Sequence, residues 1–204
     1  YWMLTADGAS HVTPPGIDPE MARYTIFVDG ISKAFAATGV RVGWAVGPVD
    51  VIDRMSSILG HVGAWAPRAE QVATAKFLDD TASIKTYVRE IKQGIVGRLN
   101  ALHEGFQAFK AQGLPVDSLS PEGAIYLTVR VAPFGKKTPD GTLLSSNEDI
   151  RKLLLDRAGV GVVPFQAFGY PDDDGWFRLS VGAVSLREVQ DALPRIGEAL
   201  RALA

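Results

Sequence analysis

The sequence predicts a mixed α/β protein whose pattern of elements changes along the chain. Three features favour this class: short apolar runs of strand length, longer stretches with apolar residues at helical spacing, and clusters of glycine and proline between them. An apolar fraction of 47% over 204 residues is enough for a hydrophobic core. We therefore expect a folded globular chain in which strands and helices alternate.

The first elements predicted along the chain are a loop and two strands. Residues 11–19 are rich in proline and glycine, which predicts a loop with a short helix capped by Asp18. The apolar run at residues 25–28 predicts a buried strand, and residues 41–46 predict a second one. Both strands end at residues that favour turns.

Two helices should follow. Apolar positions at helical spacing between residues 51 and 59 predict the first, which we expect to end at Gly60. A longer apolar stripe over residues 83–109 predicts a helix long enough to connect two domains, and Gly113 lies where it should end.

The last part of the chain predicts an α+β unit. Residues 124–131 alternate as a half-buried strand. Ser145 and Glu148 have the spacing of a capping box at the start of a helix, which Gly159 should end before a strand at residues 160–163.

The chain should end with a strand and a helix. Residues 177–181 predict the strand, and Ser185 and Glu188 form a second capping box ahead of the final amphipathic helix. No run of roughly 18 apolar residues predicts a membrane helix.

Composition excludes several classes of partner. A net charge of -2 gives no basic surface for nucleic acid or for an anionic membrane. The chain has no cysteine, which fits a reducing compartment. We expect a cytoplasmic protein with neither nucleic acid nor membrane as its partner.

One segment between the first two strands contains side chains suited to catalysis and ligand binding. In residues 30–43, Lys33 stands among small residues and Arg41 follows eight positions later. A lysine desolvated at the end of a buried strand favours the neutral amine that attacks carbonyl groups, and an arginine suits a phosphate. From the spacing alone, a solvated loop lysine and an ordinary arginine at a strand edge are the favoured interpretation.

The whole segment resembles the cofactor-lysine signature of the class I and II aminotransferases. That signature begins with a small residue, an apolar residue and Ser-Lys, continues with small residues and ends with Gly-x-Arg-apolar-Gly. The resemblance implies that Lys33 is catalytic and forms a Schiff base with pyridoxal 5'-phosphate, and that Arg41 binds the cofactor phosphate. Gly30 stands where the family often has a phosphate-binding serine, so that ligand is expected to be missing or to be supplied by another group.

Two further positions match this family. Tyr1 resembles the tyrosine of its Asp-x-x-Tyr motif, which implies a hydrogen bond to the phenolic oxygen of the cofactor. The matching aspartate would precede Tyr1 and is not in this sequence. Arg178, in Phe-Arg-Leu-Ser, resembles the arginine that pairs with the substrate α-carboxylate.

Other segments resemble the family less closely. Residues 121–126 match a strand start in its small domain, and Phe165 replaces the usual glycine after a proline, which should reshape the edge of the substrate pocket. His61 and Trp65 stand where the family sends a loop toward the neighbouring subunit. The histidines lack the spacing of a metal site, so no metal is expected.

The resemblance implies an aspartate aminotransferase fold. Residues 1–95 should be the end of a large cofactor-binding domain, with a mostly parallel sheet, helices and the start of the linking helix, and residues 96–204 a small α+β domain. The implied reaction transfers an amino group from an amino acid to a 2-oxo acid, in a homodimer with its active site at the interface.

Alternatives remain open at this point. The same fold also supports other pyridoxal phosphate reactions, such as β-elimination or a cyclase reaction, and the chain could be a non-catalytic fragment that keeps the motif. Because the chain starts at Tyr1, without the aspartate, we expect it to be part of a longer polypeptide, and to aggregate or bind cofactor poorly when expressed alone.

Overall fold

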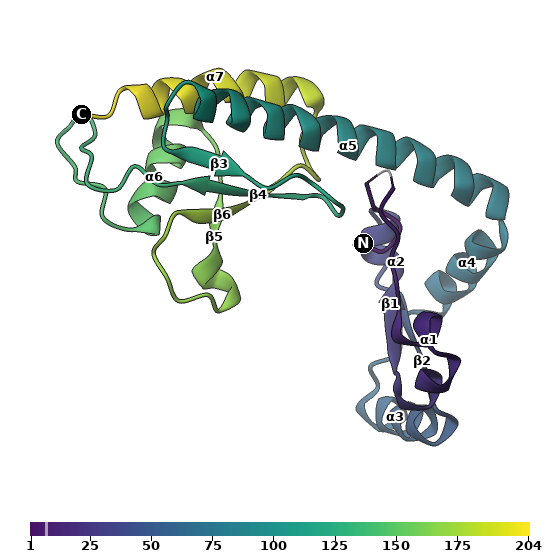
Figure 1. Cartoon of the computed structure of the whole chain (residues 1–204). Coiled ribbons are helices and arrows are strands. Elements are labelled where there is room, and N and C mark those ends of the chain that lie inside the picture. The colour runs from purple at the N-terminus through teal and green to yellow at the C-terminus, as the bar shows by residue number, and fades with distance from the viewer. Residues whose placement is uncertain (7) are drawn as a thin grey trace. The chain divides into compact units, whose positions relative to one another are not determined.

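The computed structural model describes residues 1–6 and 8–204. The chain divides into two compact units, Tyr1–Ile91 and Lys92–Ala204. One long helix, α5, runs from Thr81 to Ala111 and contributes residues to both units (Figure 1). Its extent confirms the predicted long helix.

The first unit is built from short elements. They are α1 (Pro14–Ile17), η1 (Pro19–Tyr24), β1 (Phe27–Gly30), α2 (Ile31–Ala34), β2 (Gly43–Val46), α3 (Val49–Val62), α4 (Arg68–Asp79) and the start of α5. The side chain of Asp18 caps η1 by accepting a hydrogen bond of 3.0 Å from the Glu20 amide, as predicted. Helix α4 was not predicted.

The two strands of this unit differ from the expectation. β1 and β2 pair antiparallel, from Phe27 opposite Val46 to Gly30 opposite Gly43, so these strands supply no parallel pair. Predicted burial of the first strand is wrong, because Phe27 is 37% and Val28 73% exposed. β1 is hydrogen-bonded only to β2 in the described part of the chain, which leaves its apolar side chains uncovered.

Helix α3 is longer than predicted. It continues through Gly60 to Val62 and is capped by Gly63, whose φ of +71° is the left-handed conformation that suits glycine after a helix. The Gly63 amide donates to the Leu59 carbonyl at 2.9 Å. Periodicity located the helix, but a glycine inside it was mistaken for its end.

The second unit contains β3 (Val116–Ser118), β4 (Tyr126–Val131), α6 (Asn147–Ala158), β5 (Val163–Pro164), η2 (Phe165–Phe168), β6 (Trp176–Ser180) and α7 (Leu186–Arg201). Its four strands form an antiparallel sheet in the order β3-β4-β6-β5. The predicted strand at residues 160–163 is mostly wrong, since only Val163 and Pro164 pair with β6.

The sheet of the second unit has one buried and one more open face, because successive side chains of a strand point to opposite sides. Leu127 and Val129 of β4 and Phe177 and Leu179 of β6 are buried in the core. The alternate positions of both strands are only partly buried or exposed. The helices add the remaining core side chains, which include Leu99, Phe106, Ile150, Leu154, Ile196 and Leu200.

Helix ends in this unit are fixed by capping residues. Ser185 and Glu188 form the predicted capping box of α7, and Gly159, at φ +66°, ends α6 as predicted. The capping box of α6 is shifted by one residue, to Ser146 and Asp149. Asp149 accepts hydrogen bonds from both serine hydroxyls, at 2.9 Å from Ser145 and 2.8 Å from Ser146.

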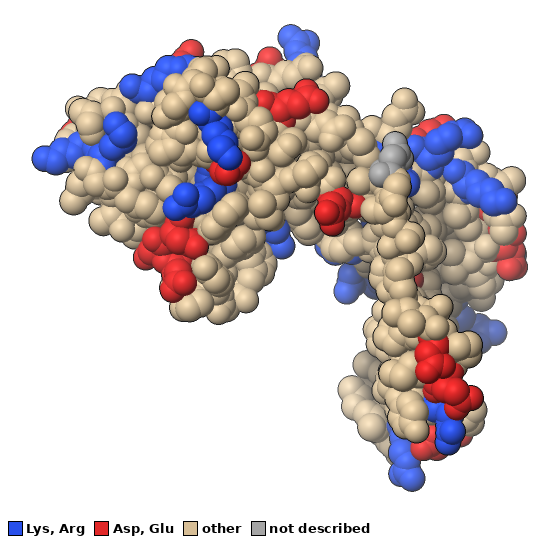
Figure 2. Space-filling model, in the orientation of Figure 1, with Lys and Arg blue, Asp and Glu red and all other residues tan. Residues whose placement is uncertain are grey.

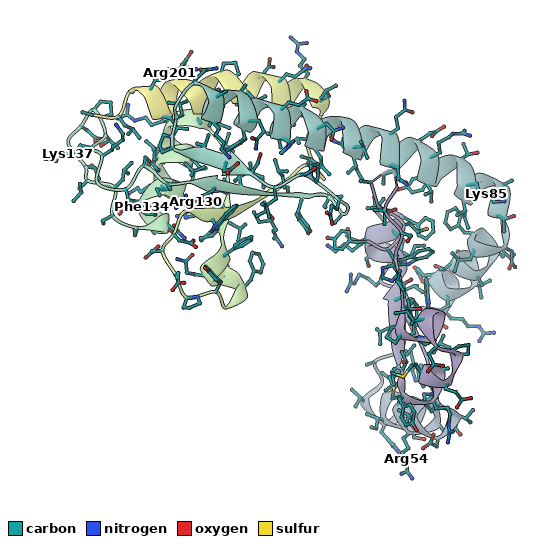
Figure 3. The ribbon with its side chains drawn as sticks, in the orientation of Figure 1. Arg54, Lys85, Arg130, Phe134, Lys137 and Arg201 are labelled. Atoms are coloured by element: carbon teal, nitrogen blue, oxygen red, sulfur yellow. The ribbon has the colours of Figure 1, made fainter. Side chains whose placement is uncertain are left out.

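Helices α5 and α7 lie side by side at two glycines (Figure 1). A Cβ atom on Gly105 of α5 would lie 2.4 Å from Cδ2 of Leu193 on α7. A Cβ atom on Gly197 of α7 would lie 2.9 Å from the Phe109 ring of α5. Arg201, labelled in Figure 3, donates to Oε1 of Gln112 at 2.6 Å and adds a polar contact to the pair.

Candidate cofactor and substrate site

Lys33 lies on a one-turn helix directly after β1. Ile31 and Ala34 of this turn are three residues apart, so they share a face, and both are buried. Lys33 points elsewhere and is exposed, and it has no ion pair among the described residues. The predicted desolvation of Lys33 is therefore wrong for this structure, because the strand before it is itself exposed.

The loop between β1 and β2, which carries Lys33 and Arg41, is closed by a backbone hydrogen bond between its two ends. The Ile31 amide donates to the Val42 carbonyl at 3.2 Å, so Lys33 and Arg41 lie near the two ends of one loop. Phe35 holds the loop inside its unit, with its ring centroid 5.1 Å from that of Phe77 and 5.9 Å from that of Tyr87.

Arg41 has an unusual backbone conformation for a residue with a side chain. Its φ is +59°, and Ala36 in the same loop has a φ of +50°. Such conformations cost of order 1–3 kcal/mol each and often occur at ligand sites. Arg41 donates from Nη1 to the Thr38 carbonyl at 2.9 Å, which leaves its other guanidinium N–H groups for a ligand.

Tyr1 belongs to a segment that is tied to β1. Nε1 of Trp2 donates to Oδ2 of Asp29 at 2.8 Å, and Oδ1 of the same carboxylate accepts from the Gly30 amide at 2.7 Å. The Leu4 amide donates to the Tyr1 carbonyl at 2.8 Å, and Leu4 is buried. Three of the predicted site residues, Tyr1, Lys33 and Arg41, thus lie on connected segments of the first unit.

Arg178 lies in the second unit, on the more open face of the sheet. Its guanidinium carbon is 4.2 Å from the ring centroid of Tyr126 and 4.4 Å from that of Phe168. Rings on this guanidinium restrict its rotation and leave its N–H edge available. No described carboxylate forms an ion pair with Arg178, so its charge is not neutralised inside this part of the chain.

A cavity of about 540 Å³ opens beside Arg178. Its lining is mostly aromatic and apolar and comprises Leu119, Thr128, Phe165, Phe168, Tyr170, Trp176 and Arg178. The Tyr170 hydroxyl donates to Oδ2 of Asp174 at 3.1 Å, and this carboxylate raises the pKa of the phenol. Arg178 is the one cationic side chain in the described lining. One cation in an apolar, aromatic cavity suits a small ligand with a carboxylate.

Sequence reasoning predicted Arg178 but missed its aromatic neighbours. Tyr126 and Thr128 on β4, and Trp176 and Arg178 on β6, alternate with buried residues along their strands. This alternation with a period of two residues was the sequence signal that could have placed these four side chains on one face of the sheet. Phe165, expected to reshape the pocket edge, lines the cavity with its ring centroid 6.2 Å from that of Phe168.

The part of the chain that the structure describes contains neither a cluster of potential metal ligands nor a membrane-spanning helix. Residues 1–6 and 8–204 contain no group of three or more potential metal-binding side chains. No helix in that part of the chain is both long and apolar enough to cross a bilayer. Positive and negative side chains are interspersed on the face shown in Figure 2.

Comparison with known proteins identifies the class. The family model of the class I and II aminotransferases matches residues 4–196, so the chain belongs to that family. This confirms the family predicted from the cofactor-lysine segment, whose cofactor is pyridoxal phosphate.

Among its relatives is a probable aspartate/prephenate aminotransferase of Rhizobium leguminosarum bv. phaseoli, which is 32% identical over 96% of this chain and 48% of that protein. The aspartate aminotransferase of Rhizobium meliloti strain 1021 is 32% identical over 98% of this chain and 46% of its own length. The chain therefore spans about half the length of the curated relatives it matches.

Solved structures confirm the fold. The aspartate aminotransferase from Rhizobium meliloti aligns with a TM-score of 0.85 and 32% identity, over 100% of this chain and 48% of that one. An aromatic aminotransferase from Pyrococcus horikoshii OT3 aligns with a TM-score of 0.82 and 28% identity, over 98% of this chain and 49% of that one. The aspartate aminotransferase fold predicted from the sequence is thus correct.

The side chains of the first unit fit pyridoxal phosphate by their chemistry. Lys33 offers an exposed amine to the carbonyl group, and Arg41 offers a guanidinium with free N–H donors to the phosphate. Tyr1 adds a phenol on the neighbouring segment. These groups suit the carbonyl, the phosphate and the phenolic oxygen of this cofactor.

Proposed function

We propose that the protein containing this chain transfers an amino group from an amino acid to a 2-oxo acid, with pyridoxal phosphate bound by Lys33, Arg41 and Tyr1. The observation that carries the proposal is the Arg178 guanidinium, which has no ion pair in the described chain and contacts two aromatic rings beside a cavity. Family membership supplies the reaction class.

When bound, the cofactor supplies a carbonyl group that condenses with amines and a ring that withdraws electrons. Lys33 holds it by its amine, and Arg41 binds the phosphate. With the cofactor in place, the Lys33 amine would remove the proton from the substrate α-carbon as a general base and would then return it as a general acid.

Arg178 binds the α-carboxylate of the substrate in this proposal. A guanidinium donates two parallel hydrogen bonds to a carboxylate, which fixes both the position and the rotation of the amino acid. The rings of Tyr126 and Phe168 hold the guanidinium in place before substrate arrives. Binding energy is then not spent on ordering the arginine side chain.

In this proposal residues 1–95 are the end of the large domain and residues 96–204 are the small domain, a division four residues after the end of the first compact unit at Ile91. We also propose that the protein is cytoplasmic and forms a homodimer. Exposed apolar side chains in and after α3 support the dimer, since Ile58 is 62%, Val62 70% and Trp65 55% exposed. His61 and Trp65 would then reach toward the partner subunit's site. Sedimentation equilibrium of the holoenzyme tests the dimer.

The function is tested by a half-reaction. Adding an amino acid to the purified holoenzyme without a 2-oxo acid should convert the bound cofactor to its amine form and release one oxo acid per site, as followed by absorbance and chromatography. Release of ammonia instead would indicate β-elimination. A full-length protein that does not absorb in the cofactor band would favour the non-catalytic alternative.

A further inference from the structure

Asn147 is a buried polar residue at the first turn of α6, with 1% of its surface exposed. Its side chain satisfies two partners at once: Oδ1 accepts from the Gly175 amide at 2.8 Å, and Nδ2 donates to Oε1 of Gln166 at 3.0 Å. The Asn147 amide donates to Oδ1 of Asp173 at 2.6 Å. Three hydrogen bonds thus join α6 to the segment 166–175.

Gln166 extends this network across the loop before β6. Its Nε2 donates to the Asp172 carbonyl at 2.8 Å and to Oδ1 of Asp173 at 3.0 Å. Arg130, labelled on β4 in Figure 3, donates from Nε to the Asp174 carbonyl at 3.1 Å. The loop is therefore held from Asn147 on one side and from β4 on the other.

The geometry of η2 connects this network to Arg178. Side chains three residues apart on a 3₁₀ helix lie on the same side, so Phe165 and Phe168 point in one direction and Gln166 in another. The two phenylalanines line the cavity, and Phe168 lies on the guanidinium of Arg178. The hydrogen bonds of Gln166 thus fix the rotation of the turn that presents Phe168.

We infer that Asn147 is a positioning residue for the carboxylate site: through Gln166 and Asp173 it sets the rotation of η2 and so holds Phe168 on the Arg178 guanidinium. This inference rests on the proposed role of Arg178. Neither Asn147 nor Gln166 is in the described lining of the cavity, so both act through Phe168.

The chemistry of the site requires asparagine at position 147. One side chain must accept from Gly175 and donate to Gln166, and an amide does both. Leucine would leave the Gly175 amide and Gln166 Oε1 without their partner, and unpaired buried polar groups are costly. Aspartate would place a second carboxylate beside Asp173 and would lack the donor.

The test compares variants of the holoenzyme. Asn147→Leu, Gln166→Leu and Asp173→Ala should each raise the KM for the amino acid about tenfold, the scale expected when a binding group is displaced, while kcat stays within about twofold. The Kd of maleate, a dicarboxylate that does not react, should rise in parallel by calorimetry. The Kd of the cofactor should not change.

Two controls separate positioning from general damage. Asp173→Asn keeps an oxygen that can accept from Asn147 and Gln166, so it should restore the low KM. Asp140→Ala removes another exposed aspartate, which accepts hydrogen bonds from Thr138 and Thr142 and, at 3.4 Å, from Arg157, but lies outside the described cavity lining. This variant should leave both KM and maleate binding unchanged.

The outcomes are distinguishable. If Arg178→Leu weakens maleate binding while the Gln166 and Asp173 variants bind maleate like the wild type, the positioning role is wrong and the proposed function stands. If Arg178→Leu itself leaves maleate binding unchanged, the proposed carboxylate site is wrong and the inference falls with it. Should Asn147→Leu fail to fold, the exposed Asp173 variants carry the test.

Discussion

The indole N–H of Trp2 donates a 2.8 Å hydrogen bond to the Asp29 carboxylate, which ties the segment of Tyr1 to the strand that leads to Lys33. We predict that Asp29→Ala raises the Kd of pyridoxal phosphate about three- to tenfold, the range for loss of the one hydrogen bond, from Trp2, that reaches the segment of Tyr1. Asp29→Asn keeps one acceptor oxygen, which can serve Trp2 but not the Gly30 amide as well, so its Kd should lie between those of the wild type and Asp29→Ala. Absorbance titration of the apoenzyme measures both, and equal affinity of Asp29→Ala and wild type would contradict the prediction.

Lys33→Ala should abolish turnover without unfolding the protein. The substitution deletes the amine that holds the cofactor and carries the proton, whereas exposed side chains usually change stability by no more than about 0.5 kcal/mol. Steady-state kinetics and thermal unfolding check the two parts. Lys85, on α5, is also exposed (Figure 3), so Lys85→Ala is the matched control and should stay active. Turnover at the wild-type rate in Lys33→Ala would rule out its proposed role.

Arg178→Leu should impair the use of amino acids and oxo acids about a hundredfold or more in kcat/KM, because it removes a two-pronged charged contact. Cofactor affinity should be retained. Arg178→Lys keeps the charge but not the fork of donors, so it should recover only part of the loss. If Arg178→Leu instead lost cofactor and kept normal substrate affinity, the proposed roles of Arg178 and Arg41 would have to be exchanged.

Gly175→Ala should destabilise the second unit more than Gly141→Ala. Both glycines have positive φ, +87° and +89°, so both substitutions carry the same backbone strain. A Cβ on Gly175 would lie 2.6 Å from the Val131 carbonyl oxygen, whereas nothing lies within 4 Å at Gly141. We expect an additional loss of about 1–3 kcal/mol from the overlap. Urea unfolding of both variants measures the difference, and equal losses would contradict the prediction.

Acid should weaken the protein partly through Asp117. The Lys110 ammonium, 2.7 Å away, and the Gln107 amide lower the pKa of this carboxyl from 3.8 to about 2. Because the folded state favours the charged form, the contribution to stability is complete above pH 3.8 and is lost as the pH falls toward 2. Asp117→Asn and Lys110→Met should both flatten the dependence of unfolding free energy on pH in this window. An unchanged slope in both variants would show that the pair is not linked to folding.

The sequence predicted the elements well where periodicity and capping act locally. The long helix over residues 83–109 and the capping box at Ser185 follow from side chains within one helix. Errors arose where two neighbouring residues compete for one role. Glu148 is held by Arg151 through bonds of 2.6 and 2.7 Å, so Asp149 takes the capping position instead.

Tertiary features of the site were less accessible from sequence. The exposure of Lys33 depends on what covers β1, which no local pattern encodes. The position of Phe168 on Arg178 depends on the four-residue helix η2 and on Asn147, which lies 19 residues before Gln166. The cofactor-lysine segment was found because its constrained positions are consecutive.

The glycine contacts between α5 and α7 limit how the second unit can move. Sliding one helix along the other by a single residue, about 1.5 Å, would carry Leu193 away from the gap at Gly105. It would also carry Phe109 away from the gap at Gly197. The helix pair therefore has one axial register, so sliding of α5 along α7 is not a route for motion within this unit.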